Sequence, residues 1–449
     1  MKGLMVSAMV SGGGKTTLTC ALMAALQSRG VRVQGFKCGP DYIDPMFHTR
    51  VLGVESRNLD LFLQGEEGVC QTYARAAQQD SLALVEGVMG FYDGAGGTDH
   101  ASAWSVAHCL DLPVVLALRP KGASLTLAAQ VKGLMGFRRP SHIAALILTD
   151  CTPALYAHLT PILEKETGLK VLGYLPSMEQ ARWPARHLGL MTADEISDFA
   201  LRVSDLGRQV EQTVDLERLL ALAGGERGKA PTTAVQEPKC TIGVAKDEAF
   251  CFYYADNLAA LERAGAKLTF FSPIRDTPPE QPVHGLYLGG GYPELYAQAL
   301  SQNTMMRAWI KDRVTSGVPT VAECGGFLYL QNTLEDVDKV PWPMCSALHG
   351  AGVKGDRLQR FGYANLTANH DSLLLRAGET VPAHEFHYWD CTENGGDLYA
   401  EKPFSSRKWR CGILTPTLYA GFPHLHFGGK LPLAQRFVEK AHHWRGMNG

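Results

Sequence analysis

The chain has 449 residues, of which 20% are charged, and its formal net charge is −2. That length allows two or three domains of ordinary size, and the near-neutral balance gives no reason to expect nucleic acid or an anionic membrane as a partner. The 11 cysteines include no C-x-x-C pair, which argues against a zinc site and against a disulfide framework.

The N-terminus lacks the charged region, apolar stretch and cleavage site of a signal peptide. No run of about 18 apolar residues suggests a membrane span. We therefore expect a cytoplasmic protein.

The first half of the sequence alternates apolar segments with amphipathic ones. Residues 3–8 predict a buried strand, and residues 15–28 predict a helix that ends near Gly30. Further strands are predicted at residues 31–36, 82–86, 112–118 and 143–149. Strands separated by helices are typical of a parallel sheet covered on both faces. We expect an α/β domain over residues 1–222.

The pattern changes after this domain. Residues 224–233 are polar, rich in glycine and proline, and without periodicity, so we predict a linker over residues 223–238. A second α/β domain is expected over residues 239–449. Its strands are predicted at residues 241–245, 285–288 and 319–322, with a helix at 255–264. The two domains should join near residue 235.

A glycine-rich segment with a lysine connects the first strand to the first helix. It reads Ser11-Gly12-Gly13-Gly14-Lys15-Thr16-Thr17. Glycine lets backbone N–H groups curl around a phosphate, and the start of the helix adds partial positive charge. Lys15 is expected to reach the β- and γ-phosphates of ATP, and the Thr16 hydroxyl to bind Mg²⁺. The alternative is a plain glycine turn, and Met9 stands where the usual motif has its first glycine.

An acidic residue, Glu86, ends the apolar run of residues 82–85. The carboxyl end of a parallel strand faces the crevice in which such sheets bind ligands. Glu86 is therefore predicted to hold Mg²⁺ opposite Thr16, as a Walker-B acid does. An acid that caps the following turn is the alternative.

Polar side chains also follow the second predicted strand. Lys37, Asp41, Tyr42, Asp44 and His48 are the candidate substrate residues of this segment. Asp41 is in addition a candidate metal ligand. Because glycine, proline and aspartate are ordinary turn formers, a solvated turn is an equal interpretation of the residues alone.

In the second half, a cysteine stands between a predicted strand and a predicted helix. The segment reads Ala322-Glu323-Cys324-Gly325-Gly326. Small residues around a nucleophile on a tight strand-to-helix turn are typical of a nucleophile elbow. A helix start also lowers the pKa of a thiol. Cys324 is thus predicted to be a nucleophile, and a buried structural cysteine is the alternative.

A nucleophilic cysteine needs a base. His424 is the best candidate, with His426 two residues later at the spacing of an orienting group. His384 and His387 form an alternative pair, and position alone does not choose between the two pairs.

Three glycines follow the predicted strand at residues 285–288. Glycine allows a backbone N–H to turn inward and stabilise a tetrahedral oxyanion. Gly290 and Gly325 are the candidate oxyanion donors, and a plain glycine turn is the alternative.

Together these residues resemble the cobyrinic acid a,c-diamide synthase family over essentially the whole chain. The resembling segments are residues 11–17, 36–48, 57–62, 85–94, 171–176, 186–190, 247–257, 288–296, 322–330, 384–388 and 424–427. The runs at 36–48 and 247–254 are the more specific ones.

The resemblance implies a dethiobiotin-synthetase-like P-loop domain joined to a class I glutamine amidotransferase domain of the flavodoxin-like kind. It implies that Cys324 is the nucleophile and His424 the activating histidine. Related glutaminases carry glutamate two residues after that histidine, where this chain has His426. Asp41, Asp44 and Glu86 match acidic positions tied to the metal and to the activated carboxylate.

Two further positions depart from the family pattern. Arg119 stands where relatives often carry aspartate, and Thr149 where they often carry asparagine. Both lie near the expected pocket for the nucleotide base, so phosphate binding is predicted more firmly than the choice of base.

The implied reaction uses ATP, Mg²⁺ and glutamine to amidate the a and c acetate carboxylates of cobyrinic acid. An acyl phosphate forms first, and ammonia from a Cys324 thioester then attacks it. Hydrogenobyrinic acid and nickel-sirohydrochlorin are alternative substrates, and the sequence allows a homodimer. An alternative of a different class is a partitioning-type switch ATPase, which would have no use for an elbow cysteine.

Overall fold

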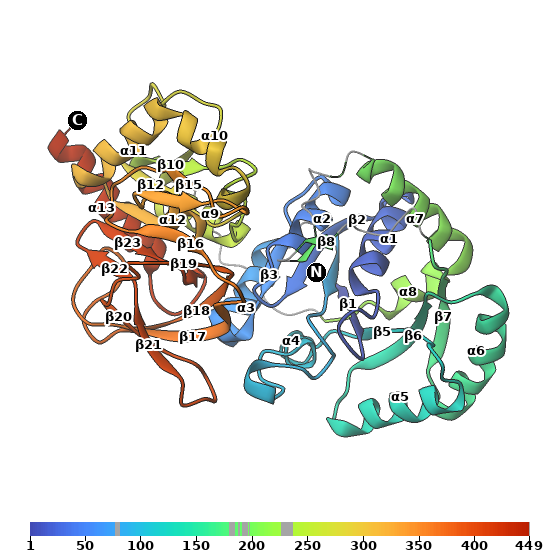
Figure 1. Cartoon of the computed structure of the whole chain (residues 1–449). Helices are drawn as coiled ribbons and strands as arrows, with labels where there is room; N and C mark the ends of the chain where they lie inside the picture. Colours follow the sequence, from blue (N-terminus) through green and yellow to red (C-terminus); the bar gives the residue numbers. More distant parts are fainter. Residues whose placement is uncertain are drawn as a thin grey trace. The chain divides into compact units, whose positions relative to one another are not determined.

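A computed structural model of the protein describes residues 1–76, 81–178, 185–186, 189–190, 196, 198–225 and 237–448. The chain divides into two compact units, Met1–Pro231 and Thr232–Gly449 (Figure 1). Much of the predicted linker, residues 226–236, lies outside the described residues, so the predicted domain bounds remain a prediction. Gly224 is described, and its backbone exchanges two hydrogen bonds of 2.8 and 3.0 Å with Gly3.

A parallel sheet forms the centre of the first unit. Its strands are β1 (Gly3–Ala8), β2 (Arg32–Cys38), β3 (Arg57–Leu59), β4 (Ser81–Glu86), β5 (Val114–Leu118), β6 (Ile143–Thr149) and β7 (Lys170–Leu175). They lie in the order β3-β2-β4-β1-β5-β6-β7, and each neighbouring pair is parallel. A separate short hairpin consists of β8 (Ala185–Arg186) and β9 (Gly189–Leu190).

Helices cover both faces of this sheet, as predicted. They are α1 (Lys15–Ser28), α2 (Ile43–Leu52), α3 (Leu61–Ala76), α4 (Ala103–Leu110), α5 (Leu125–Phe137), α6 (Pro153–Thr167), α7 (Phe199–Thr213) and α8 (Leu216–Leu222). Leu4 and Val6 of β1 contribute to the core that contains α1 and α7, whereas Met5 contributes to the core on the opposite face, with α3 to α6. Alternate strand residues thus face opposite helix layers. α1 and α7 lie side by side on one of these faces (Figure 1).

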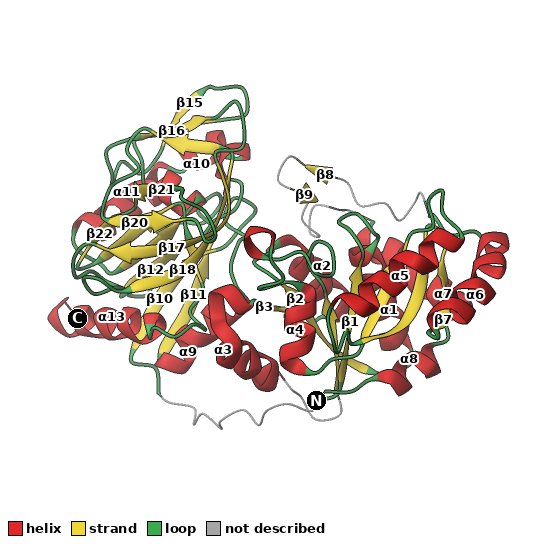
Figure 2. Ribbon diagram, turned by 90° about the horizontal axis from the view of Figure 1, so that it is seen from below, coloured by secondary structure: helices red, strands yellow, loops and turns green. Residues whose placement is uncertain are grey.

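A six-stranded sheet forms the centre of the second unit. Its strands are β11 (Ala266–Phe271), β10 (Cys240–Ala245), β12 (Gly285–Leu288), β13 (Thr320–Glu323), β23 (Leu418–Gly421) and β22 (Ile413–Thr415), in that spatial order. All neighbours are parallel except β22, which runs antiparallel to β23. The helices are α9 (Ala255–Ala264), α10 (Ala297–Gln302), α11 (Thr304–Thr315), α12 (Gly325–Tyr329) and α13 (Leu433–Asn448). α9 and α13 lie together against one face of this sheet (Figure 2).

Two antiparallel or mixed sheets, which the sequence pattern did not predict, complete the second unit. One contains β15 (Pro341–Pro343), β14 (Thr333–Glu335), β16 (Ala351–Lys354) and β19 (Trp389–Cys391). The other contains β21 (Lys408–Cys411), β20 (Leu398–Glu401), β17 (Arg360–Ala368), β18 (Thr380–His387) and β24 (His424–Leu425). Pairing of β18 with β24 places His384 directly opposite His424.

In the part of the chain that the structure describes, none of the helices combines the length and the apolar character needed to cross a membrane.

Candidate active sites

The phosphate loop, residues 11–17, leaves the carboxyl end of β1 and enters α1. Gly12 and Gly14 have φ values of +73° and +84°, a region that side chains rarely adopt. A Cβ atom at Gly13 would lie 2.7 Å from the Cβ atom of Ala8. The glycines therefore allow a turn too tight for other residues.

Lys15 lies at the start of α1 and is almost fully buried. Its Nζ donates to the carbonyl oxygens of Val10 and Met89, at 3.3 and 2.5 Å. Burial, together with the charge of Lys37, lowers the pKa of Lys15 to about 8. An incoming phosphate would favour the charged form of this lysine.

Thr16 joins a buried cluster of carboxylates. Its hydroxyl donates to Glu86 Oε1 at 2.8 Å and lies 3.3 Å from Asp44 Oδ1. Lys37 Nζ bridges the two acids, at 2.6 Å from Asp44 Oδ2 and 2.9 Å from Glu86 Oε1. The four side chains come from α1, α2, β2 and β4. The parallel strands β2 and β4 end at the same edge of the sheet.

Glu86 is completely buried, yet its carboxylate stays ionised. Burial disfavours its charge, but Lys37 and a 2.7 Å contact with His48 Nε2 outweigh burial and hold the pKa of Glu86 well below its usual range. Burial and the neighbouring carboxylates of Asp41 and Glu86 raise the pKa of Asp44. Burial would lower the pKa of Lys37, yet Asp44 and Glu86 raise it.

The candidate substrate segment forms the start of α2. Asp41 accepts hydrogen bonds from the backbone N–H groups of Ile43 and Asp44, at 2.8 and 3.2 Å. Its carboxylate thus caps the helix, while Asp44 contacts Thr16. Tyr42 is the residue that directly precedes α2.

Ser56 is a member of this site that sequence reasoning missed. Its hydroxyl lies 3.1 Å from His48 Nδ1, so the ring of His48 is held between Ser56 and Glu86. Serine in a short connection carries no distinguishing sequence signal.

Thr149, at the end of β6, contacts the phosphate loop. Its hydroxyl donates to the Gly13 carbonyl at 3.0 Å, and a Cβ atom at Gly14 would lie 3.3 Å from Thr149. Arg119 forms an ion pair with Asp150 next to it. Thr149 therefore contacts the phosphate loop, and the expected effect of Thr149 and Arg119 on the choice of nucleotide base stays a prediction.

Oxygen donors of this kind suit Mg²⁺, which proteins usually hold with one or two carboxylates together with phosphate oxygens and water. Thr16, Glu86 and Asp44 supply a hydroxyl and two carboxylates. Among the described residues, no group of three or more His, Cys, Asp or Glu side chains is arranged to hold a metal. The three oxygen donors fit Mg²⁺ that is held together with phosphate oxygens and water.

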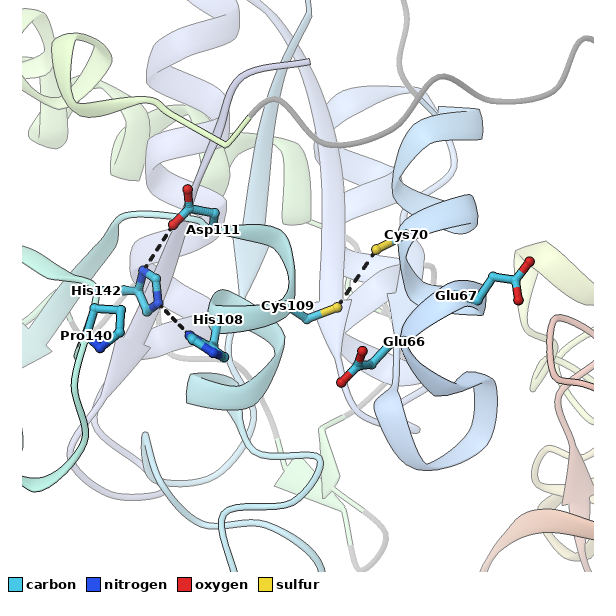
Figure 3. Close-up of a pocket in the computed structure, with 8 residues that line it drawn as sticks. All are labelled: Glu66, Glu67, Cys70, His108, Cys109, Asp111, Pro140 and His142. Carbon is cyan, nitrogen blue, oxygen red and sulfur yellow. Dashed lines mark hydrogen bonds and ion pairs between the residues drawn. The ribbon is translucent and has the colours of Figure 1, made fainter.

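Figure 3 shows a pocket on the first unit. It is lined by Glu66, Glu67, Cys70, His108, Cys109, Asp111, Pro140 and His142. Asp111 and His142 precede β5 and β6, so this pocket lies at the amino ends of the strands, whereas the phosphate loop lies at the carboxyl ends. His142 is held between His108, at 3.1 Å, and Asp111, at 3.7 Å. This pocket is therefore separate from the phosphate loop.

In the second unit, Cys324 is the residue between β13 and α12. Its φ of +47° and ψ of −100° are unusual for a side chain other than glycine. Its N–H donates to the Gly421 carbonyl at 2.8 Å. A Cβ atom at Gly326 would lie only 2.0 Å from the Leu288 carbonyl oxygen. This is the strained backbone geometry of a nucleophile elbow.

The Cys324 thiol is not activated in the way the sequence suggested. Burial raises its pKa, and the charge of Glu294 raises it further, while a hydrogen bond from the Gly325 N–H opposes them. Burial and Glu294 therefore act against the lowering of the pKa that the sequence predicted for this thiol. A protonated thiol needs a base at the moment of attack.

His424 lies on β24 and its ring contacts the glycine loop after β12. A Cβ atom at Gly290 would lie 2.6 Å from His424 Cε1, and one at Gly325 would lie 3.2 Å from the Gly291 N atom. The glycine loop therefore approaches both the elbow and the histidine. Glycine is required here because any side chain at Gly290 would displace the ring.

The remaining histidines of this region are neutral. Burial lowers the pKa of His426 to about 3. Burial and the charge of His424 lower that of His384 to about 3, and burial lowers that of His387 to about 4. His426 Nδ1 accepts a hydrogen bond of 3.0 Å from the Gly428 N–H.

Both halves of the chain match known domains. Residues 4–190 match the CobQ/CobB/MinD/ParA nucleotide binding domain. Residues 241–431 match the CobB/CobQ-like glutamine amidotransferase domain. The chain therefore combines nucleotide binding with glutamine amidotransferase activity.

Similarity to curated proteins extends over the full length. The cobyrinate a,c-diamide synthase of Clostridium acetobutylicum is 38% identical over 98% of this chain and 100% of its own length. That of Clostridium tetani is 37% identical over 98% and 100%, and that of Salmonella typhimurium 38% over 96% and 96%. The chain belongs to the cobyrinate a,c-diamide synthase family of glutamine-dependent ligases.

Proposed function

We propose that this protein amidates the a and c acetate carboxylates of cobyrinic acid, with ATP as the activating nucleotide and glutamine as the nitrogen source. One chain contains both a phosphate loop, whose Thr16 contacts Glu86, and a strained cysteine elbow, whose Glu323 lies close to His424. This combination carries the proposal. A switch ATPase would need only the first of these sites.

In the first unit, the γ-phosphoryl group of ATP transfers to an oxygen of the substrate carboxylate, and ADP leaves. Lys15 and the N–H groups of residues 11–17 bind the phosphates. Thr16, Glu86 and Asp44 would hold Mg²⁺. Asp44 replaces Asp41, the ligand suggested by the sequence, because the Asp41 carboxylate accepts hydrogen bonds from the start of α2. Mg²⁺, when bound, adds positive charge near the transferring group.

The buried ion cluster has a second task at this site. Lys37 and His48 fix the Glu86 carboxylate in its ionised form and in one orientation. Because these charges are set before ATP arrives, no reorganisation is needed during the reaction. Lys37, Asp44 and His48 are therefore proposed to hold the charges of this site in fixed positions.

In the second unit, Cys324 Sγ attacks the side-chain amide carbon of glutamine while its proton passes to His424. A bond forms between sulfur and carbon, and the backbone N–H groups of Gly290 and Gly325 are the proposed donors to the developing oxyanion. The carbon–nitrogen bond then breaks, His424 returns the proton to the leaving nitrogen, and ammonia departs. Water cleaves the thioester to glutamate and restores the thiol.

Ammonia completes the reaction in the first unit. It attacks the acyl carbon, the bond between that carbon and the phosphate oxygen breaks, and phosphate and a proton leave. The product is a carboxamide, and two such cycles give the diamide.

Replacement of Cys324 tests this division of labour. Cys324→Ala should abolish amidation from glutamine yet leave amidation from added ammonium salts within about twofold, because the phosphate site is untouched. Cys411→Ala, which removes another buried thiol of the second unit, is the control and should retain both activities. Loss of both activities in Cys324→Ala, with a folded protein, would refute the proposal.

The identity of the carboxylic acid requires a direct comparison of substrates. We expect cobyrinic acid to be converted to a diamide faster than hydrogenobyrinic acid or nickel-sirohydrochlorin, as judged by mass spectrometry of the products. The homodimer and the cytoplasmic location predicted from the sequence are also proposals, and sedimentation of the purified protein tests the first.

A further inference from the structure

A buried carboxylate directly precedes the proposed nucleophile. Glu323, the last residue of β13, is only 1% exposed. Its Oε1 accepts a hydrogen bond of 2.9 Å from the Leu425 N–H, and its Oε2 accepts one of 3.1 Å from the Tyr287 hydroxyl. The same Oε2 lies 3.7 Å from Nδ1 of His424.

An asparagine also binds the segment that follows His424. Asn257 of α9 donates through Nδ2 to the Leu425 carbonyl at 2.7 Å and accepts at Oδ1 from the Phe427 N–H at 2.7 Å. Its Nδ2 also lies 3.3 Å from the Tyr287 hydroxyl. Both backbone groups of Leu425 are therefore bound by side chains, which fixes the position of His424 next to it.

His426 is not placed to orient His424. Its Nδ1 accepts from the Gly428 N–H, and its ring lies 4.9 Å from that of Tyr254. Glutamate at this position in related glutaminases would supply a negative charge, which a buried neutral imidazole does not. The segment thus lacks an orienting acid of its own.

We propose that Glu323, held by the Tyr287 hydroxyl and the Leu425 N–H, is the positioning residue of the glutaminase site and takes over the orienting role that His426 does not fill. Its carboxylate keeps the proton of His424 on Nδ1, so that Nε2 is the nitrogen that accepts the thiol proton. The inference rests on the proposed roles of Cys324 and His424. It links the base to the nucleophile because Glu323, the last residue of β13, directly precedes Cys324.

Glu323→Gln tests the role of the charge at nearly constant volume. The amide oxygen can still accept from the Leu425 N–H, but the amide N–H₂ group would donate toward His424 Nδ1 and favour the wrong tautomer. We expect kcat for glutamine hydrolysis to fall about 100-fold or more, with KM for glutamine changed less than about twofold. Amidation from ammonium salts should persist.

Two further variants make the test specific. Glu262→Gln changes an exposed glutamate of α9 and should leave kcat unaltered. His426→Asn retains an acceptor for the Gly428 N–H and should lose far less than Glu323→Gln. A kcat of Glu323→Gln within threefold of the wild type, or an equal loss in His426→Asn, would overturn the inference.

Folding is checked by thermal unfolding of each variant. If Glu323→Gln does not fold, Tyr287→Phe decides: loss of the bond to Glu323 Oε2 should lower kcat about fivefold at constant KM, and an unchanged kcat would contradict the assignment. Glutamine hydrolysis that survives in Cys324→Ala would instead refute the proposed nucleophile, so the two failures are distinguishable.

Discussion

The two proposed sites solve the problem of a buried reaction centre in different ways. In the first unit, side chains hold one another: Lys37 bridges Asp44 and Glu86, and His48 binds the second oxygen of Glu86. In the second unit, side chains hold backbone: Glu323 and Asn257 bind the peptide groups of residues 425 and 427. Ion pairs between side chains therefore hold the first site, whereas hydrogen bonds from side chains to the backbone hold the second.

The difference follows from the chemistry that each site performs. Phosphoryl transfer redistributes negative charge, so fixed charges that are already paired lower its barrier. Thiol attack on an amide moves one proton over a short distance, and it therefore depends on the direction of a hydrogen bond. The buried Cys324 thiol, whose pKa is raised, suits the second task, whereas ionised Glu86 suits the first.

The largest effect is expected from loss of charge at the phosphate loop. Lys15→Met should lower amidation from glutamine and from ammonium about 10² to 10³-fold, because the transferring phosphoryl group loses its cation. Lys132→Met removes an exposed lysine of α5 and serves as the control. Steady-state assays with either nitrogen source provide the measurement, and selective loss of the glutamine-dependent reaction would contradict the division between the sites.

Addition of a single methyl group at the cysteine elbow of the second unit should lower the stability of the protein. Gly326→Ala places a Cβ atom against the Leu288 carbonyl, 2.0 Å away in the unrelaxed backbone, and should lower the free energy of unfolding by about 3 kcal/mol. Gly446→Ala, where no atom lies within 4 Å of the new Cβ atom, is the matched control. Urea denaturation compares the two, and equal stabilities would show that the elbow tolerates side chains.

Ionisation of Glu385, a buried residue of β18 in the second unit, should lower the stability of the protein. Burial raises the pKa of Glu385 to about 7 from its ordinary value of 4.5. The folded state therefore binds more protons than the unfolded state between these values, and stability falls as pH rises through this window. This rise in pKa corresponds to a loss of roughly 3 kcal/mol at most in the free energy of unfolding. Wild type and Glu385→Gln should be similar in stability at pH 4.5, and the variant should be the more stable above pH 7, as measured by denaturation at both pH values. A constant difference would contradict the prediction.

The smallest expected effect concerns Thr149, which supports the phosphate loop through one neutral hydrogen bond. Thr149→Val keeps the shape of the side chain but removes the bond to the Gly13 carbonyl. We expect KM for ATP to rise about fivefold, equivalent to about 1 kcal/mol, with kcat nearly constant. Thr160→Val on α6 is the control, and an unchanged KM in both variants would contradict a role of Thr149 in the loop.

Much of the fold could be predicted because the buried parallel strands are continuously apolar. The predicted bounds of β1, β6, α1, α9 and β12 agree with the structure. The antiparallel sheets of the second unit could not be predicted, since short strands such as β24 find their partners about 40 residues away, where local periodicity carries no information.

The proposed sites were only partly predictable. Sequence motifs identify residues next to glycine turns, such as Lys15 and Cys324, because the backbone of these turns accepts only glycine at certain positions. They do not name Glu323 or Asn257, whose roles depend on strands that meet only in the folded chain. The acidic residue at the end of an otherwise apolar strand was the one available signal for Glu323.

Transfer of labelled nitrogen tests the central claim most directly. The purified protein is incubated with cobyrinic acid, ATP, Mg²⁺ and glutamine labelled with nitrogen-15 in its side-chain amide, and the product is analysed by mass spectrometry. The account predicts a diamide in which both new amides carry the label, and no labelled product from Cys324→Ala. Unchanged cobyrinic acid, or labelled diamide from Cys324→Ala, would contradict it.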